Sequence, residues 1–206
     1  MGRGDSQAER RPGSVRSSRA SRYLVVPSIE DIAMSVVSGE EVAACCKAYV
    51  KINPNGVDLA PKQVSKLPMD ATIFLHGDRR GYLGEDGLLV TAKADLVPDG
   101  QGFYRFESGS MYELRFPEVS VPADCTGVAF PRSTINRLGI VKLESAVFDS
   151  GYRGEPTQVI FTPIRATIHR EEAMVQLVFF RNEKAATSLY SGFYQNEKGE
   201  PGPSKA

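Results

Sequence analysis

The segment TQVIFTPIRATI, residues 157–168, decides the fold class of this chain. It combines β-branched and aromatic residues in short apolar runs, a composition that favours a β-strand over a helix. The segments MYELRFPEVSVP (111–122) and AMVQLVFFRN (173–182) have the same character, and Pro, Gly, Asp and Asn residues separate them. Many short strands without alternating helices predict a barrel or a jelly roll rather than a doubly wound parallel sheet.

Length and composition limit the kinds of protein that this can be. Of the 206 residues, 41% are hydrophobic, which is enough for one core and a single domain that we place at residues 23–190. Lys plus Arg and Asp plus Glu both number 25, so no overall field attracts nucleic acid or a membrane. No apolar run approaches the roughly 18 residues of a membrane span. We expect a soluble, cytoplasmic protein that binds neither nucleic acid nor a membrane.

The N-terminal part has a different composition. Residues 1–22 are rich in Arg, Ser and Gly and nearly devoid of large apolar groups, which predicts a disordered basic tail. An organelle transit peptide stays an alternative for this segment. A short N-terminal helix should follow, because Ser28 and a nearby acid fit a capping box, apolar residues from Ile29 to Val36 share one helical face, and Gly39 would end the run.

Cysteines and histidines give no sign of a metal site. Cys45, Cys46 and Cys125 are an odd number without a CxxC pair, which argues against a disulfide framework or a structural zinc site. We expect them to be ordinary small apolar residues. His76 and His169 are not near a cysteine pair, so the chain does not fit the zinc-dependent nucleobase deaminases.

The segment AVFDSGYRGEP, residues 146–156, interrupts a strand-like region. Asp, Ser and Gly are residues that fill turns easily. A carboxylate, an aromatic ring and backbone amides freed by glycine are also what a nucleotide pocket needs. From these residues alone, a plain turn and a binding site both stay open.

The segment FPRSTINRLGI, residues 130–140, is a second candidate for a site. It places Arg132, Ser133 and Arg137 after an apolar strand, at what we predict to be a single helical turn. Backbone amides and guanidinium groups both donate to phosphate oxygens, so this is a candidate anion site. The alternative is a capped surface helix with solvated arginines.

The order of the segments is more informative than any one of them. Together they resemble the motifs of the dUTPase and dCTP deaminase superfamily, from about residue 28 to the C-terminus. The resemblance implies an all-β, distorted jelly-roll or β-barrel fold, a homotrimer with active sites between subunits, a deoxynucleoside triphosphate substrate and Mg²⁺. It also implies that residues 191–206 are a mobile C-terminal arm that folds over the phosphates. The matching segments are GVDLAP (56–61), VPADCTGVAFPRSTINRLGI (121–140), ESAVFDSGYRGEPTQVIF (144–161), AMVQLVFF (173–180) and GFYQNEKGEPGPSKA (192–206).

The same resemblance assigns roles to single residues. Asp149 matches the catalytic base, and Tyr152 matches the aromatic residue that packs on the deoxyribose. Asp58 matches an acid that would contact Mg²⁺ through water. The other substrate-binding positions, most of them expected at the phosphates, are Arg132, Ser133, Thr134, Arg137, Gln176, Gln195 and Lys198.

Two chemistries share this scaffold in the superfamily. The hydrolase cleaves dUTP to dUMP and pyrophosphate, which keeps uracil out of DNA and supplies dUMP for dTMP synthesis, whereas the deaminase converts dCTP. The essential glutamate of the deaminase branch lies ten residues after the motif's aspartate, and here Val159 holds that position. The residues around Tyr152 are closer to the hydrolase motif DYRGE. The resemblance therefore implies a Mg²⁺-dependent dUTP diphosphatase of the archaeal type.

Other readings of the same motifs stay open. A dCTP deaminase or a bifunctional enzyme would need a displaced proton donor, for which Gln158 and Glu155 are the candidates. A catalytically silent member of the superfamily could bind nucleotide without turning it over.

Residues 70–107 are the part that the resemblance explains least. Their Gly, Asp and Arg residues predict one or two hairpins with a charged loop. The residues in question are His76, Asp78, Arg79 and Arg80. These side chains could contact a ligand or a neighbouring subunit, or they could be solvated.

Overall fold

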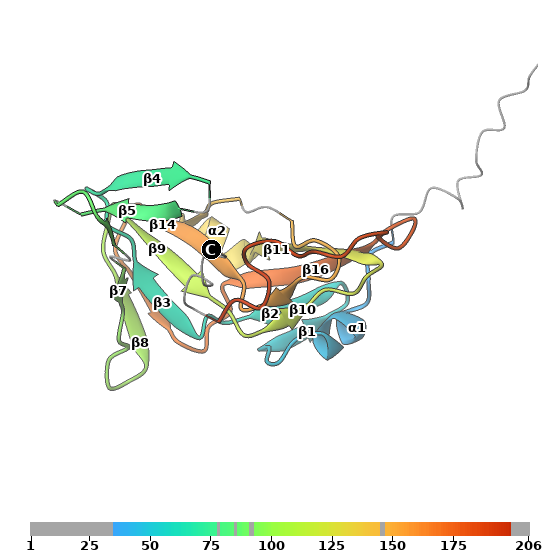
Figure 1. Ribbon diagram of the computed structural model, residues 1–206. Helices are drawn as coiled ribbons and strands as arrows, with labels where there is room; N and C mark the ends of the chain where they lie inside the picture. The colour runs from blue at the N-terminus through green and yellow to red at the C-terminus, as the bar shows by residue number, and fades with distance from the viewer. Residues whose placement is uncertain (1–34, 78, 85, 91–92, 145–146, 199–206) are drawn as a thin grey trace, which may run out of the picture. The chain divides into compact units, whose positions relative to one another are not determined.

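The structure is a computed structural model that describes residues 35–198, apart from 78, 85, 91–92 and 145–146 (Figure 1). All of the described residues belong to one compact unit, Ala33–Ala206. The predicted basic tail at 1–22, the first part of the predicted helix and residues 199–206 of the predicted arm lie outside the described residues.

The first main sheet is antiparallel and has the strand order β1-β2-β16-β11. Its longest pairing joins β11 to β16 over the whole length of both strands, and β2 pairs on the other side of β16. In the strand sequence VQLVFFR of β16, most side chains are buried, as expected for a central strand with little polar alternation. The bounds are β1 Lys51–Asn53, β2 Gly56–Leu59, β11 Cys125–Pro131 and β16 Val175–Arg181.

The second main sheet is also antiparallel, with the order β12-β14-β9-β3-β7. In β14 buried and partly exposed residues alternate strictly, which is the period of a strand with one face in the core. The bounds are β3 Gln63–Lys66, β7 Ala94–Asp95, β9 Ser110–Arg115, β12 Val141–Lys142 and β14 Thr157–Thr162. Four further strands form two antiparallel two-stranded sheets. One pairs β8 Phe103–Phe106 with β15 Ala166–His169, and the other pairs β10 Val119–Ser120 with β13 Arg153–Gly154.

Buried side chains of both main sheets form one hydrophobic core. Val57 and Phe179 from the first sheet, and Leu114 and Ile160 from the second, belong to the same cluster, and each is 0–1% exposed. The three segments predicted as strands all contain strands. The fold is therefore all-β and of the jelly-roll type, as predicted, although the strands of the described residues form separate sheets rather than one closed barrel.

The helix near the N-terminus begins where we predicted that one would end. Helix α1, Gly39–Ala44, is capped by Ser38, whose Oγ accepts a hydrogen bond from the amide of Glu41. The preceding residues are extended, and Val36 forms a β-bridge with Phe180 of β16. A Cβ on Gly39 would lie 1.8 Å from the carbonyl oxygen of Asn53. The expected end at Gly39 is thus wrong: Ser38 is the N-cap of a helix that begins at Gly39, where glycine is required for close packing rather than for helix termination.

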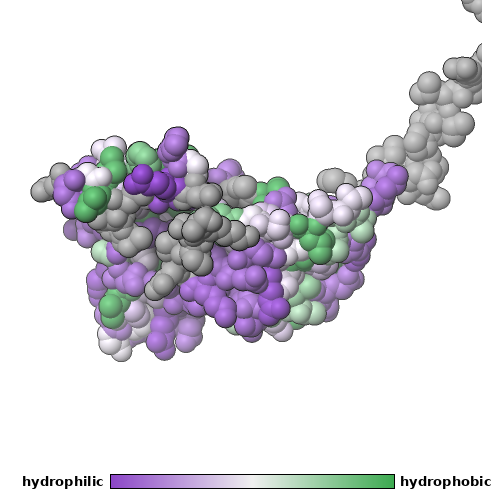
Figure 2. Space-filling model, viewed as in Figure 1, coloured by the Kyte–Doolittle hydropathy of each residue, from purple (hydrophilic) through white to green (hydrophobic). Residues whose placement is uncertain are grey.

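A separate three-stranded sheet, β4-β5-β6, contains the hairpin predicted for residues 70–107. Its strands are β4 Thr72–His76, β5 Arg79–Leu83 and β6 Leu89–Val90. Ile73 and Leu75 on β4 are 73% and 72% exposed, and Figure 2 shows apolar surface over this sheet at the upper left. Asp78, one of the residues singled out above, lies outside the described residues.

The cysteines are small apolar residues, as predicted. Cys125 is 1% exposed in the core, while Cys45 and Cys46 pack partly against it, and all three are free. Burial raises the pKa of Cys46 to about 12 and that of Cys125 to about 11, so neither thiol is a ready thiolate. Among the described residues, no helix is long and apolar enough to span a membrane.

Candidate active site

Three predicted site residues meet at one end of the first sheet. Asp58 on β2 and Gln176 on β16 are cross-strand partners, and Arg132 directly follows β11 on the other side of β16. Arg132 Nε lies 3.1 Å from Oδ2 of Asp58, and a second nitrogen of the guanidinium lies 3.2 Å from the carboxylate of Glu172. We call Asp58, Arg132 and Gln176 the Arg132 cluster.

Both oxygens of the Asp58 carboxylate have partners. Its other oxygen, Oδ1, accepts a hydrogen bond of 2.8 Å from Asn53 Nδ2, and the residue is 3% exposed. A buried carboxylate needs such compensation, so the role that the contacts show for Asp58 is to hold and orient Arg132. Its predicted contact with Mg²⁺ through water stays a prediction.

Helix α2, Ser133–Arg137, extends the Arg132 cluster along the chain. Arg132 occupies the N-cap position with extended backbone, and Ile135 anchors the helix in the core at 4% exposure. Ser133 and Thr134, in the first turn, are exposed, and the first amides of a helix have no partner within it. The prediction of an apolar strand followed by one helical turn is confirmed, and Arg137 is also exposed.

A second group of predicted residues lies on the turn that follows Phe148. Phe148 pairs with Gly127 of β11, and the amide of Tyr152 donates to the carbonyl of Asp149 over 3.0 Å. Ser150 Oγ donates to the carbonyl of Cys125 over 2.7 Å, which fixes the turn to the start of β11. We call residues 149–155 the Asp149 loop. The turn and the site are therefore compatible readings, since the turn presents the exposed carboxylate of Asp149.

Gly151 has a backbone that few other residues could adopt. Its φ is +81°, and a Cβ at this position would lie 2.7 Å from Cβ of Leu189. Glycine is therefore required in the Asp149 loop both by conformation and by the close approach of the C-terminal segment.

Tyr152 is buried rather than open to a ligand. Its ring stacks on Phe148 with 5.4 Å between centroids and meets the edge of Tyr190 at 5.9 Å, leaving 4% of the residue exposed. The hydroxyl donates a hydrogen bond of 2.8 Å to Glu197 Oε1. Burial and the Glu197 carboxylate raise the pKa of Tyr152 well above its ordinary value. The role of Tyr152 at a sugar stays a prediction, and it would require the covering segment to move.

The covering segment is the described part of the predicted arm. Gln195 binds the Asp149 loop twice, donating from Nε2 to the carbonyl of Gly151 over 2.9 Å and accepting at Oε1 from the amide of Arg153 over 3.0 Å. The amide of Asn196 donates to the carbonyl of Arg153 over 2.7 Å. The arm therefore lies along the Asp149 loop of its own chain, held by backbone and side-chain bonds.

Lys198, at the end of the described arm, borders a cavity of about 240 Å³ with Lys47, Arg153 and Glu118. The Glu118 carboxylate accepts from Lys47 over 2.8 Å and from Arg153 over 2.9 Å. These two bonds hold the pKa of Glu118 below its ordinary value. Lys198 thus joins the Asp149 loop rather than the Arg132 cluster.

The two groups lie at opposite ends of β11. The Asp149 loop is fixed near Cys125 and Gly127, whereas Arg132 follows the last residue of the strand. At the rise of a β-strand, the five residues from Gly127 to Arg132 span about 17 Å. A carboxylate that activates water must lie within hydrogen-bond reach of the reacting group. Within one chain, Asp149 and Arg132 therefore belong to groups at opposite ends of β11.

The alternative proton donors considered above are placed unfavourably. Gln158 points into the core at 2% exposure and donates to the carbonyl of Thr157. Glu155 Oε1 accepts a 2.6 Å hydrogen bond from Lys62. Val159, the residue after Gln158, is half-buried on β14 and pairs in register with Glu113 of β9.

Sequence reasoning missed the residues that join the arm to the Asp149 loop. Glu197 and Tyr190 cover Tyr152, and Arg80 of the hairpin contacts the rings of Phe193 and Tyr194. The aromatic and acidic residues of the arm are visible in the sequence, but nothing in their spacing indicates which distant segment they contact.

Comparisons with known proteins agree on one family. The family model described as dCTP deaminase-like matches residues 28–182. A relative from Aeropyrum pernix, named a probable deoxyuridine 5'-triphosphate nucleotidohydrolase, is 37% identical over 149 residues, covering 71% of this chain and 86% of its own length. A protein from Methanocaldococcus jannaschii named deoxyuridine 5'-triphosphate nucleotidohydrolase is 26% identical over 147 residues, or 70% of this chain and 87% of its own.

A solved structure supports the fold. The crystal structure of 2'-deoxycytidine 5'-triphosphate deaminase from Agrobacterium tumefaciens superposes with a TM-score of 0.52 at 18% identity. The match covers 71% of this chain and 48% of that one, so the chain spans about half the length of that structure. At this identity the likeness establishes a shared fold and nothing about substrate.

Proposed function

This chain belongs to the dCTP deaminase-like family, and we propose that it is a dUTP diphosphatase that hydrolyses dUTP to dUMP and pyrophosphate. The names of its archaeal relatives support this activity. The geometry supports it as well, because the Asp149 loop presents an exposed carboxylate while the Arg132 cluster presents an oriented guanidinium.

The valine at position 159 is the observation that favours hydrolysis over deamination. The deaminase branch that the chain resembles has a glutamate at this position, and a valine cannot carry protons to a ring nitrogen. The residue paired with Val159 across the sheet is Glu113, whose carboxylate lies 2.6 Å from Lys93 and 3.4 Å from Arg115. Both oxygens of this carboxylate are therefore already bonded to cationic side chains.

In the proposed reaction, Asp149 orients a water molecule and accepts its proton as the water oxygen attacks the α-phosphorus. The bond between that phosphorus and the bridging oxygen of the pyrophosphate breaks, and pyrophosphate leaves with the electron pair. Arg132, Ser133 and Thr134 would stabilise the charge on the phosphates through guanidinium, hydroxyl and amide donors. Gln176 and Arg137 would complete this set from β16 and α2.

The remaining proposed contacts with the substrate involve the deoxyribose and the C-terminal arm. The ring of Tyr152 would pack on the deoxyribose once the arm shifts, and Gln195 and Lys198 would close over the nucleotide from the arm. Mg²⁺, if bound as in the superfamily, would neutralise triphosphate charge, with Asp58 reaching it only through water.

We also infer that the active enzyme is a homotrimer with sites between subunits. The support is the separation of the Asp149 loop from the Arg132 cluster along β11, since a second copy can bring its Asp149 to the Arg132 of the first. Each chain would then contribute Asp149 to one active site and Arg132 to another.

Incubation with Mg²⁺ and either dUTP or dCTP, followed by ion-exchange separation of the nucleotides, tests the proposed function. We expect dUMP from dUTP and no change in dCTP. Conversion of dCTP to dUTP or dUMP would show deamination, and Glu113→Gln would then identify whether Glu113 has taken over the role of the missing glutamate. Binding of dUTP without any product would establish a silent family member instead.

A further inference from the structure

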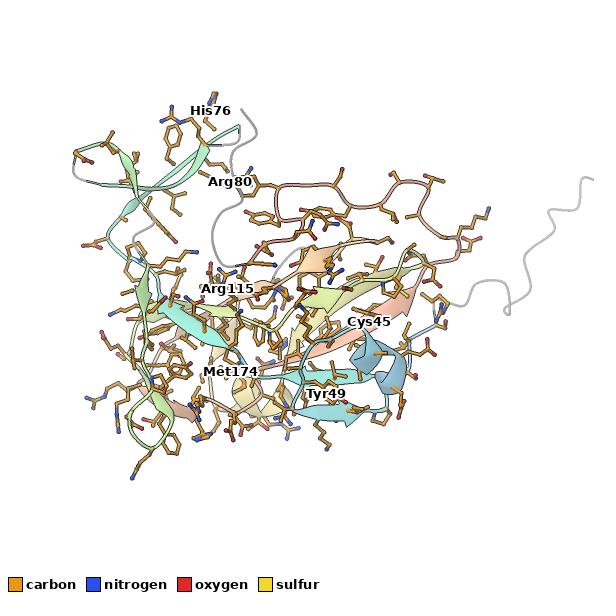
Figure 3. All side chains as sticks on the ribbon, turned by 60° about the horizontal axis from the view of Figure 1, so that its bottom comes forward. Cys45, Tyr49, His76, Arg80, Arg115 and Met174 are labelled. Carbon is orange, nitrogen blue, oxygen red and sulfur yellow. The ribbon has the colours of Figure 1, made fainter. Side chains whose placement is uncertain are left out.

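The side chain of Arg80 connects the hairpin of β4 and β5 to the C-terminal arm. The guanidinium carbon of Arg80 lies 4.1 Å from the ring centre of Phe193 and 5.7 Å from that of Tyr194. Arg80 Nη1 also donates a long hydrogen bond of 3.4 Å to the hydroxyl of Tyr194. In Figure 3, Arg80 lies on the side of the hairpin toward the arm, while His76 lies at the outer end.

The two rings form one platform for the guanidinium. Phe193 and Tyr194 pack edge to face with 5.2 Å between centroids and an angle of 83°. A guanidinium over an aromatic face is attracted by the ring quadrupole, and its planar shape lets it stack and donate at the same time. A lysine could supply the charge but not the stacked plane.

Phe193 and Tyr194 lie just before the arm residues that bond to the Asp149 loop. Gln195 follows Tyr194 directly and binds Gly151 and Arg153. Glu197, two residues further on, binds Tyr152. A contact that fixes the arm at 193–194 therefore also fixes the register in which the arm meets the Asp149 loop.

We propose that Arg80 is a positioning residue that clasps the arm against the Asp149 loop of its own chain. The hairpin thereby sets how often the arm covers Tyr152. Its importance for catalysis rests on the proposed function of the Asp149 loop, but the clasp itself is a property of the protein without substrate.

Arg79 provides a matched control on the same strand. Its guanidinium carbon lies 5.6 Å from the ring centre of Phe74, within the hairpin itself. Arg79→Ala removes the same charge and a similar cation–π contact while leaving the arm's partner in place. A change common to both variants would report on the hairpin rather than on the arm.

Hydrogen exchange in the full-length protein measures the clasp directly. The amides of Asn196 and Glu155 are bonded across the arm and the loop, to Arg153 and Glu197, so their exchange reports opening of the arm. We expect Arg80→Ala to speed their exchange by about 3- to 30-fold, the range that corresponds to a cation–π contact from exposed to desolvated. Arg80→Lys should lie between this variant and the wild type, and Arg79→Ala should match the wild type.

Phe193→Ala tests the same contact from the arm, in case the change on β5 disturbs the hairpin. The double variant Arg80→Ala, Phe193→Ala should exchange about as fast as the faster single variant, because both remove one interaction. Fully additive effects, or wild-type exchange in Arg80→Ala, would overturn the proposal.

Kinetics then connect the clasp to the reaction. Because the docked arm covers Tyr152 and must shift before a sugar can pack there, kcat/KM for dUTP should rise in Arg80→Ala by about the same factor as the exchange, and Phe193→Ala should show the same rise. If Arg80→Ala speeds hydrogen exchange but neither the wild type nor any variant hydrolyses dUTP, the contact between Arg80 and the arm is supported and the proposed function is refuted. Changed exchange with unchanged kcat/KM in an active enzyme would refute the role of the clasp in catalysis.

Discussion

Two aspartates show how the same side chain is adapted to different tasks. Asp58 is buried and holds Arg132 and Asn53, so its charge serves the structure around it. Asp149 is exposed at the head of a turn whose hydrogen bonds use the backbone rather than its carboxylate. A water-activating base needs open space and a free lone pair, and of these two only Asp149 has the open position.

The change Asp149→Asn tests this assignment. It keeps the shape of the side chain but removes the proton acceptor, so pyrophosphate release from dUTP should fall by about two to four orders of magnitude. Binding of dUTP, measured by equilibrium titration, should survive because the Arg132 cluster is untouched. Asp70→Asn, at an exposed position outside both groups, is the control, and near-normal turnover in Asp149→Asn would show that another group activates the water.

The sequence singled out candidate site residues, but it did not predict the surroundings in which the structure places them. The motif order singled out Asp149, Arg132 and Gln195, and the last two do bond to other parts of the proposed machinery. The burial of Tyr152 beneath Glu197 depends on the chain folding back across 45 residues. No local pattern encodes such a contact, since it arises from the tertiary path of the chain.

Helices and strands were predicted correctly where the segment is long enough to show its pattern of apolar and polar residues. β14 and β16 were predicted because six or seven residues establish a strand pattern. Helix α1 has only six residues, so its N-cap at Ser38 was outweighed by a more helical-looking stretch that begins ten residues earlier. The arm has no regular element in the described residues and is held by Gln195 and its neighbours instead.

Docking of the arm should depend on pH through Glu197. Burial raises the pKa of its carboxyl, the carboxylates of Glu113 and Glu155 add to this, and the hydrogen bond from Tyr152 and the charge of Arg115 oppose it. Between the ordinary pKa and the raised one, the docked arm holds a proton that the released arm lacks. Docking is therefore strongest at acid pH and weakens as pH rises through the docked-state pKa.

Hydrogen exchange of the Asn196 amide, corrected for the intrinsic rate and followed from about pH 5 to about pH 8, measures this dependence. Protection should decrease with rising pH in the wild type. Glu197→Gln, which cannot ionise but keeps an acceptor for Tyr152, should flatten the profile. Protection that rises with pH, or a slope that persists in Glu197→Gln, would show that another group controls the arm.

At the scale of the whole molecule, β11 acts as a spacer. It holds the Asp149 loop at its beginning and Arg132 beyond its end, so the rigidity of the first sheet keeps the two groups apart. Neither sequence nor a single chain determines which surface of a second copy brings them together. The proposed assembly rests on the chemistry of the proposed site, in which the base and the phosphate ligands must meet.

Mixing two inactive variants tests the shared site. Asp149→Asn and Arg132→Ala each remove one half, and in mixed oligomers an intact site forms where a normal Asp149 of one chain meets a normal Arg132 of another. Random mixing should restore activity at about a quarter of the sites. The double variant mixed with itself is the inactive control, and mixed oligomers that form but do not hydrolyse dUTP would place the whole site within one chain.

The central claim is that water, activated by Asp149, attacks the α-phosphorus of dUTP. Hydrolysis in water enriched in oxygen-18, with mass spectrometry of both products, tests this claim most directly. The account predicts dUMP that carries a single heavy oxygen, unlabelled pyrophosphate, and unchanged dCTP in a parallel sample. Label in the pyrophosphate, release of dUDP and phosphate, or conversion of dCTP would contradict it.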